Sequence, residues 1–191
     1  MFIVSITLKH VFRLAAIAGT ALILSGCLGG PSIPDYPGSG AAEPAKLTEV
    51  VFEKATISLA PGWDKDTSMV NNDTIVAGFK KGPSIGYVQC MSSLLKADVV
   101  GDVMREGVAG ASGNAQLVRG PFAVAGGLNK PYIEVHQGTV TSEGQEIDAA
   151  FYIGYNSFRY LGCNYGVMLI HTGTPNPETE AEFVAMFRTL K

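Results

Sequence analysis

Residues 131–155 read PYIEVHQGTVTSEGQEIDAAFYIGY, and this stretch decides the fold. Apolar and polar residues alternate on both sides of Ser142-Glu143-Gly144, a pattern typical of two antiparallel strands joined by a tight hairpin. A two-residue loop, Glu143-Gly144, would set His136 opposite Phe151, whereas a three-residue loop that includes Ser142 pairs Val135 with Phe151. We favour the three-residue loop because Gly144 supplies the left-handed residue that it needs, and because the apolar residues then share one face.

With that register, the odd-numbered positions form the core face of the sheet. Aromatic and polar side chains lie on the even face, between glycines: Tyr132, Glu134, His136, Tyr152, Tyr160 and Asn164. Amphipathic aromatic side chains are favoured at recognition surfaces, and glycines in strands permit close approach of another group. We therefore expect a shallow binding surface here. The alternatives are a helix packed over this face and a face open to solvent.

The remaining elements extend this hairpin into a larger sheet. A third long strand over residues 159–170 follows, with Cys163 opposite Phe151 by the same parity. Other strands are expected at Thr56–Leu59, Thr74–Lys80 and Ser84–Met91, with short ones around Leu117 and at Phe122–Val124. Helical spacing predicts helices at Ala97–Ala109 and Pro177–Leu190, the second with Asn176 as its N-cap. The pattern predicts one α+β domain over residues 47–191, an antiparallel sheet of about six strands with two helices.

Four features of this region together resemble the Mog1/PsbP-like group of small α/β/α domains. They are the early strand that ends in Ser58-Leu59-Ala60-Pro61-Gly62-Trp63, the mid-chain helix, the long meander, and the closing helix that ends in Phe187-Arg188-Thr189-Leu190. The resemblance covers about residues 47–191. It implies a binding or assembly accessory, a class that includes lipoproteins, and it transfers no functional residues.

The N-terminus has the composition of an export signal. Lys9, His10 and Arg13 precede an uncharged apolar run over residues 14–24. Eleven residues are too few for a helix to span roughly 30 Å of hydrocarbon. The run ends in Leu24-Ser25-Gly26-Cys27, which resembles the bacterial lipobox. That resemblance implies removal of residues 1–26, diacylglycerol on the Cys27 thiol and acylation of its new amino group. An ordinary secretory signal with a chance cysteine is the alternative.

Several acyl chains on one residue are enough for stable membrane anchoring. Leu28 follows the cysteine, where lipoproteins retained at the inner membrane tend to have Asp, so we expect the outer membrane, with the domain facing the periplasm. Residues 27–46 form the anchor and a tether. Eight of the nineteen residues after Cys27 in this segment are Gly or Pro, and an unpacked chain of this kind reaches roughly 60 Å. A packed arm around Ile33 and Tyr36 is the alternative.

Two cysteines remain besides Cys27. Cys90 and Cys163 form an even pair in an oxidising compartment, and we expect a disulfide between them. Two buried thiols, or a metal or redox role, are the alternatives; the sequence contains no Cys-x-x-Cys motif.

Charge and motifs limit the function classes. The whole chain carries a net charge of -3, and the mature chain carries 12 basic and 17 acidic residues once Lys9 and Arg13 are removed. No basic cluster occurs, which argues against nucleic-acid binding. The sequence has no G-x-S-x-G, H-E-x-x-H or Gly-rich phosphate loop, so we expect no catalytic residues, metal or cofactor. The favoured function is a non-enzymatic accessory that binds an envelope protein or small ligand. The alternative is an envelope hydrolase or metal-dependent enzyme that uses Glu134, His136 and Asn164.

Overall fold

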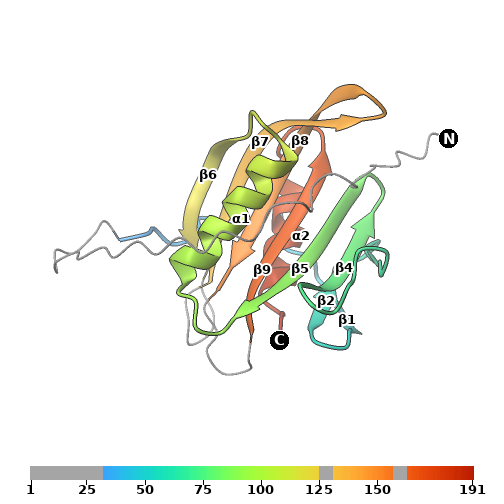
Figure 1. Ribbon diagram of the computed structural model, residues 1–191, viewed down its shortest axis with the longest axis vertical. Helices are drawn as coiled ribbons and strands as arrows, with labels where there is room; N and C mark the ends of the chain where they lie inside the picture. Colours follow the sequence, from blue (N-terminus) through green and yellow to red (C-terminus); the bar gives the residue numbers. More distant parts are fainter. Residues whose placement is uncertain (1–31, 125–130, 157–162) are drawn as a thin grey trace.

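The computed structural model describes residues 32–124, 131–156 and 163–191 (Figure 1). Its strands are β1 (Thr48–Val51), β2 (Thr56–Leu59), β3 (Asp64–Lys65), β4 (Ile75–Lys81), β5 (Ser84–Ser92), β6 (Gln116–Ala123), β7 (Tyr132–Ser142), β8 (Gln145–Tyr155) and β9 (Cys163–Thr172). Its helices are α1 (Ala97–Ala111) and α2 (Pro177–Phe187). Seven strands form one antiparallel sheet in the order β3-β4-β5-β9-β8-β7-β6, and β1 pairs with β2 in a second, smaller sheet. The predicted α+β class, with two helices in a single domain, is confirmed.

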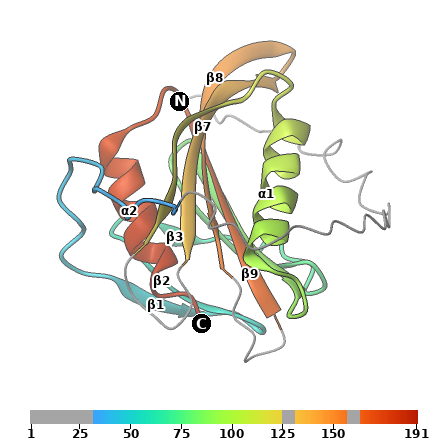
Figure 2. The ribbon, with the colours of Figure 1, turned by 90° about the vertical axis from the view of Figure 1, so that its left-hand side faces the viewer.

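Both faces of the large sheet are covered. Figure 2 shows α1 on one side and α2 with the β1–β2 ribbon on the other. One buried cluster joins Val100, Met104 and Val108 of α1 to Phe151 and Ile153 of β8. A second cluster lies on the other side of the sheet, against α2 and β2. In the described part of the chain, no helix is long and apolar enough to cross a membrane.

The predicted hairpin register is wrong. The loop is the two-residue Glu143-Gly144, and His136 lies opposite Phe151. Both loop residues have positive φ angles, 52° and 80°, the backbone of a two-residue turn whose twist matches that of the strands. The predicted pairing of Phe151 with Cys163 is also wrong, since Phe151 lies opposite Ile170. The parity argument failed because it assumed one apolar face, and this sheet buries apolar residues on both.

The predicted shared binding surface is wrong as well. Glu134 and His136 lie on the face that α1 covers, whereas Tyr152 lies on the α2 face. The glycines do mark close approach, but by side chains of the two helices. A Cβ on Gly154 would come within 3.0 Å of the Phe187 ring, and one on Gly166 would collide with the Met104 sulfur. Helices fill the space that was expected to hold a ligand. Tyr160 lies outside the described residues.

The element boundaries follow local signals where such signals exist. Asn176 caps α2 as predicted, since its side chain accepts hydrogen bonds from the backbone N–H of Glu178 and Thr179. The two short strands predicted around Leu117 and Phe122 are one strand, β6, with irregular register against β7. β1 and β3 were not predicted. Both are short, and every residue of β3 and most of β1 are exposed, so no apolar alternation marks them.

Cys90 and Cys163 are joined by a disulfide bond, with their Cα atoms 5.2 Å apart. The bridge links β5 to β9, which are neighbours in the sheet. It closes a loop that contains α1 and three of the seven strands of the large sheet, β6, β7 and β8.

The predicted unpacked tether is wrong for residues 34–43, which we call the strap. Asp35 forms a parallel bridge with Ala123 at the end of β6. The Tyr36 N–H donates to the Ala123 carbonyl, and the Ala123 N–H donates to the Pro34 carbonyl, each at 2.8 Å. Further along, Glu43 forms an ion pair with Arg188 beyond α2. The blue segment in Figure 2 follows this course from β6 around α2. The packed-arm alternative therefore holds here.

Candidate functional site

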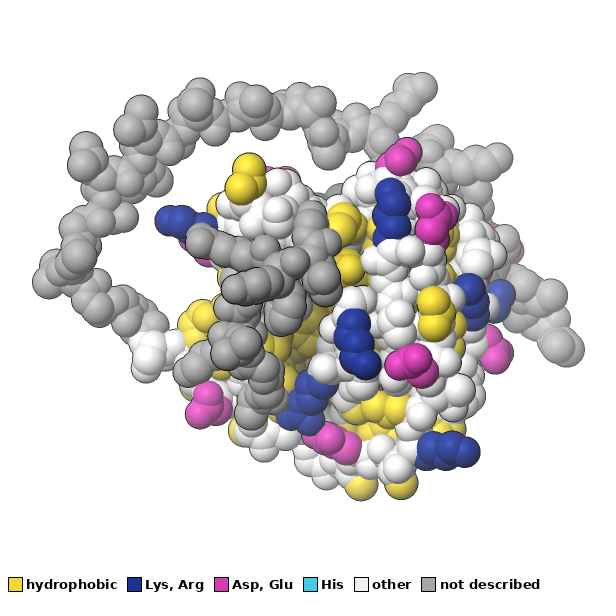
Figure 3. All heavy atoms as spheres, turned by 90° about the horizontal axis from the view of Figure 1, so that it is seen from below, with side chains coloured by type: hydrophobic (Ala, Val, Ile, Leu, Met, Phe, Trp, Pro, Cys, Tyr) yellow, Lys and Arg dark blue, Asp and Glu magenta, His cyan; other side chains and the backbone are white. Residues whose placement is uncertain are grey.

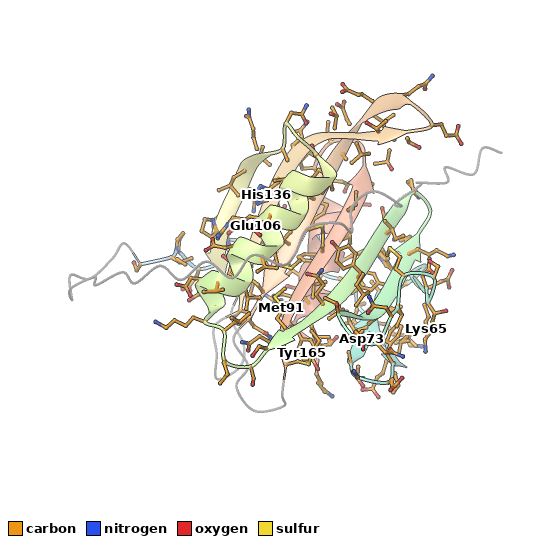
Figure 4. The ribbon with its side chains drawn as sticks, in the orientation of Figure 1. Lys65, Asp73, Met91, Glu106, His136 and Tyr165 are labelled. Atoms are coloured by element: carbon orange, nitrogen blue, oxygen red, sulfur yellow. A yellow bond between two sulfur atoms is a disulfide. The ribbon has the colours of Figure 1, made fainter. Side chains whose placement is uncertain are left out.

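A buried carboxylate lies beneath α1 and organises the main polar cluster of the domain. Glu134 on β7 is 1% exposed. Arg105 of α1, His136 of β7 and Tyr155 of β8 surround it, and we call these four residues the Glu134 cluster. Figure 4 shows His136 beside α1, on the face that this helix covers. Alternation along β7 puts Glu134 and His136 on the same face, and register with β8 places Tyr155 near them.

Every neighbour in the cluster directs a donor at Glu134. Arg105 donates from Nη2 to Oε1 at 2.6 Å and from Nε to Oε2 at 3.1 Å. The Tyr155 hydroxyl donates to Oε1 at 2.9 Å, and Nε2 of His136 lies 2.9 Å from Oε2. Arg105 also donates to Asp102, one turn back on α1, at 2.6 Å. A bidentate guanidinium–carboxylate pair with two further donors fixes the position of α1 over the sheet.

These donors control the ionisation of Glu134. Burial alone would raise the pKa of its carboxyl, but hydrogen bonds from His136, Arg105 and Tyr155 outweigh burial and lower that pKa from 4.5 to about 2. The same contacts raise the pKa of the Arg105 guanidinium. Burial and the neighbouring carboxylate raise the pKa of Tyr155. The cluster is therefore a fixed ion pair at neutral pH.

A general base needs a free lone pair on a group that can change its protonation state near neutral pH. Glu134 does not meet this requirement, because donors occupy both of its oxygens and its pKa is far below 7. Among the hydrogen bonds of the described residues, no Ser, Thr or Cys side chain contacts His136. In the same ranges, no group of three His, Cys, Asp or Glu side chains is placed to hold a metal ion.

The other residues predicted for a binding surface have structural contacts. The Tyr132 ring packs against Tyr155, with centroids 5.6 Å apart. Asn164 is fully buried and its amide donates to the carbonyls of Ser92 and Leu95, which holds the turn that leads into α1. Tyr152 exchanges hydrogen bonds with the backbone of Asn176, on the other face of the sheet. The structure thus unites Glu134 and His136 and separates them from Tyr152.

Arg105 is the residue that the sequence interpretation missed. It lies one turn after Asp102 on a helix, which in sequence is the ordinary signature of an exposed i,i+3 pair. Nothing in the sequence places it near residue 134, because that contact depends on which face of the sheet α1 covers.

A serine–histidine contact joins β5 to β9. Ser84 and His171 lie just beyond the paired residues Ile85 and Ile170, and Ser84 Oγ is 2.8 Å from His171 Nδ1. Burial lowers the pKa of His171, so the ring is neutral at pH 7. No carboxylate hydrogen-bonds to this histidine among the described residues, and Ser84 is buried. The pair lacks the third group that orients a catalytic histidine, and it is a cross-strand polar contact.

The exposed side of α1 has a different character. Val99 and Val103 are 39% and 38% exposed, one turn apart. Asp98, Asp102 and Glu106 form an acidic stripe beside them, each four residues from the next, and all three are exposed. Two of these side chains also favour the helix, since Asp98 lies in its first turn and Asp102 pairs with Arg105. We call the two valines and the three acidic residues the α1 surface.

Another face of the domain carries side chains of both charges. Figure 3, a view from below, shows basic and acidic side chains interspersed, with hydrophobic side chains between them. This face therefore carries no block of positive charge of the kind that nucleic acids require.

Comparisons with known proteins bear on the fold. No family model matches the chain, and no curated protein matches its sequence. Solved structures do match. The Ran-binding protein Mog1p of Saccharomyces cerevisiae superposes with a TM-score of 0.54 over 76% of this chain and 95% of that chain, at 9% sequence identity. The chain has the Mog1 fold. A point mutant of protein Mog1 gives a TM-score of 0.53 with the same identity and coverage. At this identity the similarity shows the fold and no shared residues.

Proposed function

We propose that the chain is a cell-envelope lipoprotein, anchored at the outer membrane through Cys27, whose domain binds a protein partner and catalyses no reaction. The basic region, the short apolar run and Leu24-Ser25-Gly26-Cys27 support the anchor. They occur in the order that lipoprotein signals require.

The observation that carries the binding role is the occupied carboxylate of Glu134. The alternative function, an envelope hydrolase or metal-dependent enzyme, needs Glu134 or His136 to accept a proton or hold a metal. Donors from α1, β7 and β8 already occupy Glu134. The shared fold with a Ran-binding protein is a second support, because that protein binds another protein.

The α1 surface is the region best suited to the partner. Two exposed valines supply apolar contact area, and three acidic side chains favour a partner with basic side chains around an apolar patch. Arg105 is the one basic residue inside this helix, and it is already engaged by Glu134 and Asp102.

Site-specific photo-crosslinking in the native host tests this proposal. A benzoylphenylalanine at Val103 should yield a discrete crosslinked protein, and one at Val51, an exposed valine on β1, should not. The Asp98→Lys/Glu106→Lys variant, which leaves the Asp102–Arg105 pair intact, should abolish the crosslink, because the partner is expected to be basic. A crosslink that survives this charge reversal, or equal crosslinking at both valines, would contradict the proposed surface.

The enzyme alternative and the anchor each have a direct test. Stoichiometric zinc in the purified domain, or a hydrolase activity lost in His136→Ala, would replace the binding role with the enzyme. For the anchor, Cys27→Ser should release the protein from the membrane fraction of its host. A variant that is processed and fractionates like the wild type would show that Cys27 is not the lipid site.

A further inference from the structure

The chain that carries the proposed lipid anchor joins the domain at a defined place. Pro34 and Tyr36 are hydrogen-bonded to Ala123, so the chain that comes from the N-terminus reaches the domain beside the end of β6. Tyr36 fixes this attachment further, because its hydroxyl donates to the buried Glu180 at 2.9 Å. Arg119 of β6 also binds Glu180, at 3.1 Å, and donates to the Gly38 carbonyl. The attachment is therefore held by backbone pairing and by a buried carboxylate.

The length of chain between the lipid and this point is short. Pro34 is the seventh residue after Cys27. At about 3.1 Å per residue an extended chain of this length reaches roughly 22 Å, about a third of the reach expected for an unpacked tether. The β6 side of the domain must therefore stay close to the bilayer.

Exposed apolar side chains lie at both ends of this edge. β6 is the last strand of the large sheet, and the strap pairs only with its end. Leu117 and Val118 are 46% and 49% exposed, and Ile33, next to the attachment point, is 38% exposed. These are three of the seven large hydrophobic residues that are exposed in the described part of the chain. The one charged side chain of β6, Arg119, is held by Glu180 and the Gly38 carbonyl.

We infer that Ile33, Leu117 and Val118 form a membrane-contact edge that rests on the bilayer surface. This inference depends on the proposed lipid anchor, which brings the edge to the membrane and holds it there. Burial of apolar side chains at the interface then adds to the attachment. The sheet stands with its β6 edge towards the lipid, and the α1 surface faces sideways, free for a partner. Figure 2 looks towards this edge, between α1 and α2.

Fluorescence quenching with the intact, lipidated protein tests this inference. Cys27 is acylated and Cys90 is bridged to Cys163, so an introduced cysteine is the only reactive thiol. Val118→Cys and the control Val103→Cys are each labelled with nitrobenzoxadiazole and reconstituted into phosphatidylethanolamine–phosphatidylglycerol vesicles with nitroxide-bearing lipid. We expect emission at position 118 to be lost through quenching and emission at position 103 to be unchanged. Gln116→Cys, an exposed polar position on the same edge, provides a second probe of the contact.

The outcomes separate this inference from the proposed function. Flotation with the vesicles reports the anchor, independently of the label. If the protein floats and the labels at 118 and 116 emit like the label at 103, the membrane-contact edge is wrong and the anchor stands. If the protein does not float, and mass spectrometry finds no acyl chains on Cys27, both are wrong. A soluble Cys27→Ser protein should show no quenching at any position.

Discussion

At the scale of the residue, the contacts of Glu134 decide whether it acts as an acid/base group or as part of a structural ion pair. In sequence, Glu134 and His136 form a possible acid/base pair on one face of a strand. In the structure the same two residues, with Arg105 and Tyr155, form a satisfied ion-pair cluster. Removing one partner of a buried pair is far more destabilising than the pair itself is stabilising, since the other charge is left buried.

Glu134 should therefore make stability depend on pH. Its pKa is about 2 in the folded protein and close to 4.5 when unfolded, so its contribution is complete above pH 4.5 and is lost as the pH falls towards 2. The difference corresponds to about 3 kcal/mol. Urea denaturation from pH 7 to pH 2 should show a smaller acid loss of unfolding free energy in Glu134→Gln than in wild type. Glu106→Gln, on the exposed side of α1, should behave like wild type. Equal acid loss in all three proteins would contradict this account.

At the scale of the element, α2 is positioned by the Asn176 cap at its first turn and by the strap that crosses it. Asn176 caps the helix and also contacts the Tyr152 hydroxyl. The strap then crosses α2, and its Tyr36 meets Glu180 on the helix. These contacts join three segments that are far apart in the sequence.

The contribution of the Asn176 cap to the free energy of unfolding should be measurable. Asn176→Ala removes the acceptor for the Glu178 and Thr179 N–H groups and should lower the free energy of unfolding by about 1 kcal/mol. Asn176→Ser should retain most of that stability, because Ser is also a good N-cap. Chemical denaturation of the three proteins compares them. An alanine variant as stable as wild type would show that the cap contributes nothing.

The strap should loosen when its side-chain contact is removed. Tyr36→Phe deletes the hydroxyl that donates to Glu180, so amide exchange in residues 34–40 should become faster. Hydrogen–deuterium exchange with mass spectrometry measures this on peptides from the strap. Tyr87→Phe, whose hydroxyl lies on the other face of the sheet near Met168, should leave the strap unchanged. Exchange in wild-type strap peptides as fast as in an unstructured chain would show that the strap is not docked.

At the scale of the whole molecule, the disulfide and the proposed lipid anchor set the context of the domain. The disulfide links β5 to β9 across a sequence separation of 73 residues. In the proposed setting the strap turns a long tether into a short one, which determines how far from the membrane the domain can work.

The bridge should contribute strongly to stability. In the chain-entropy model a loop of this size is worth about 4 kcal/mol, because the unfolded chain loses conformational freedom. Cys90→Ser/Cys163→Ser should therefore unfold at much lower urea concentration than the oxidised wild type. Intact mass after alkylation without reduction checks the bond itself. Two alkylated thiols in the exported protein would remove this prediction.

Local sequence patterns alone predicted several features of this protein. The cap at Asn176, the strand at Thr56–Leu59, the α+β class and the pairing of Cys90 with Cys163 were all predicted, because each depends on a short motif, on periodicity or on cysteine count. The lipid site at Cys27 rests on the sequence entirely and stays a prediction.

Tertiary structure decided the rest. Whether residues 142–144 make a two- or three-residue turn depended on whether one or both faces of the sheet are covered. The partner of Glu134 depended on where α1 lies, and the course of residues 34–43 depended on a free edge at Ala123 and a buried carboxylate at Glu180. Contacts between segments so far apart leave no pattern in the local sequence, because their energy comes from burial and charge pairing that exist only after the layers have packed.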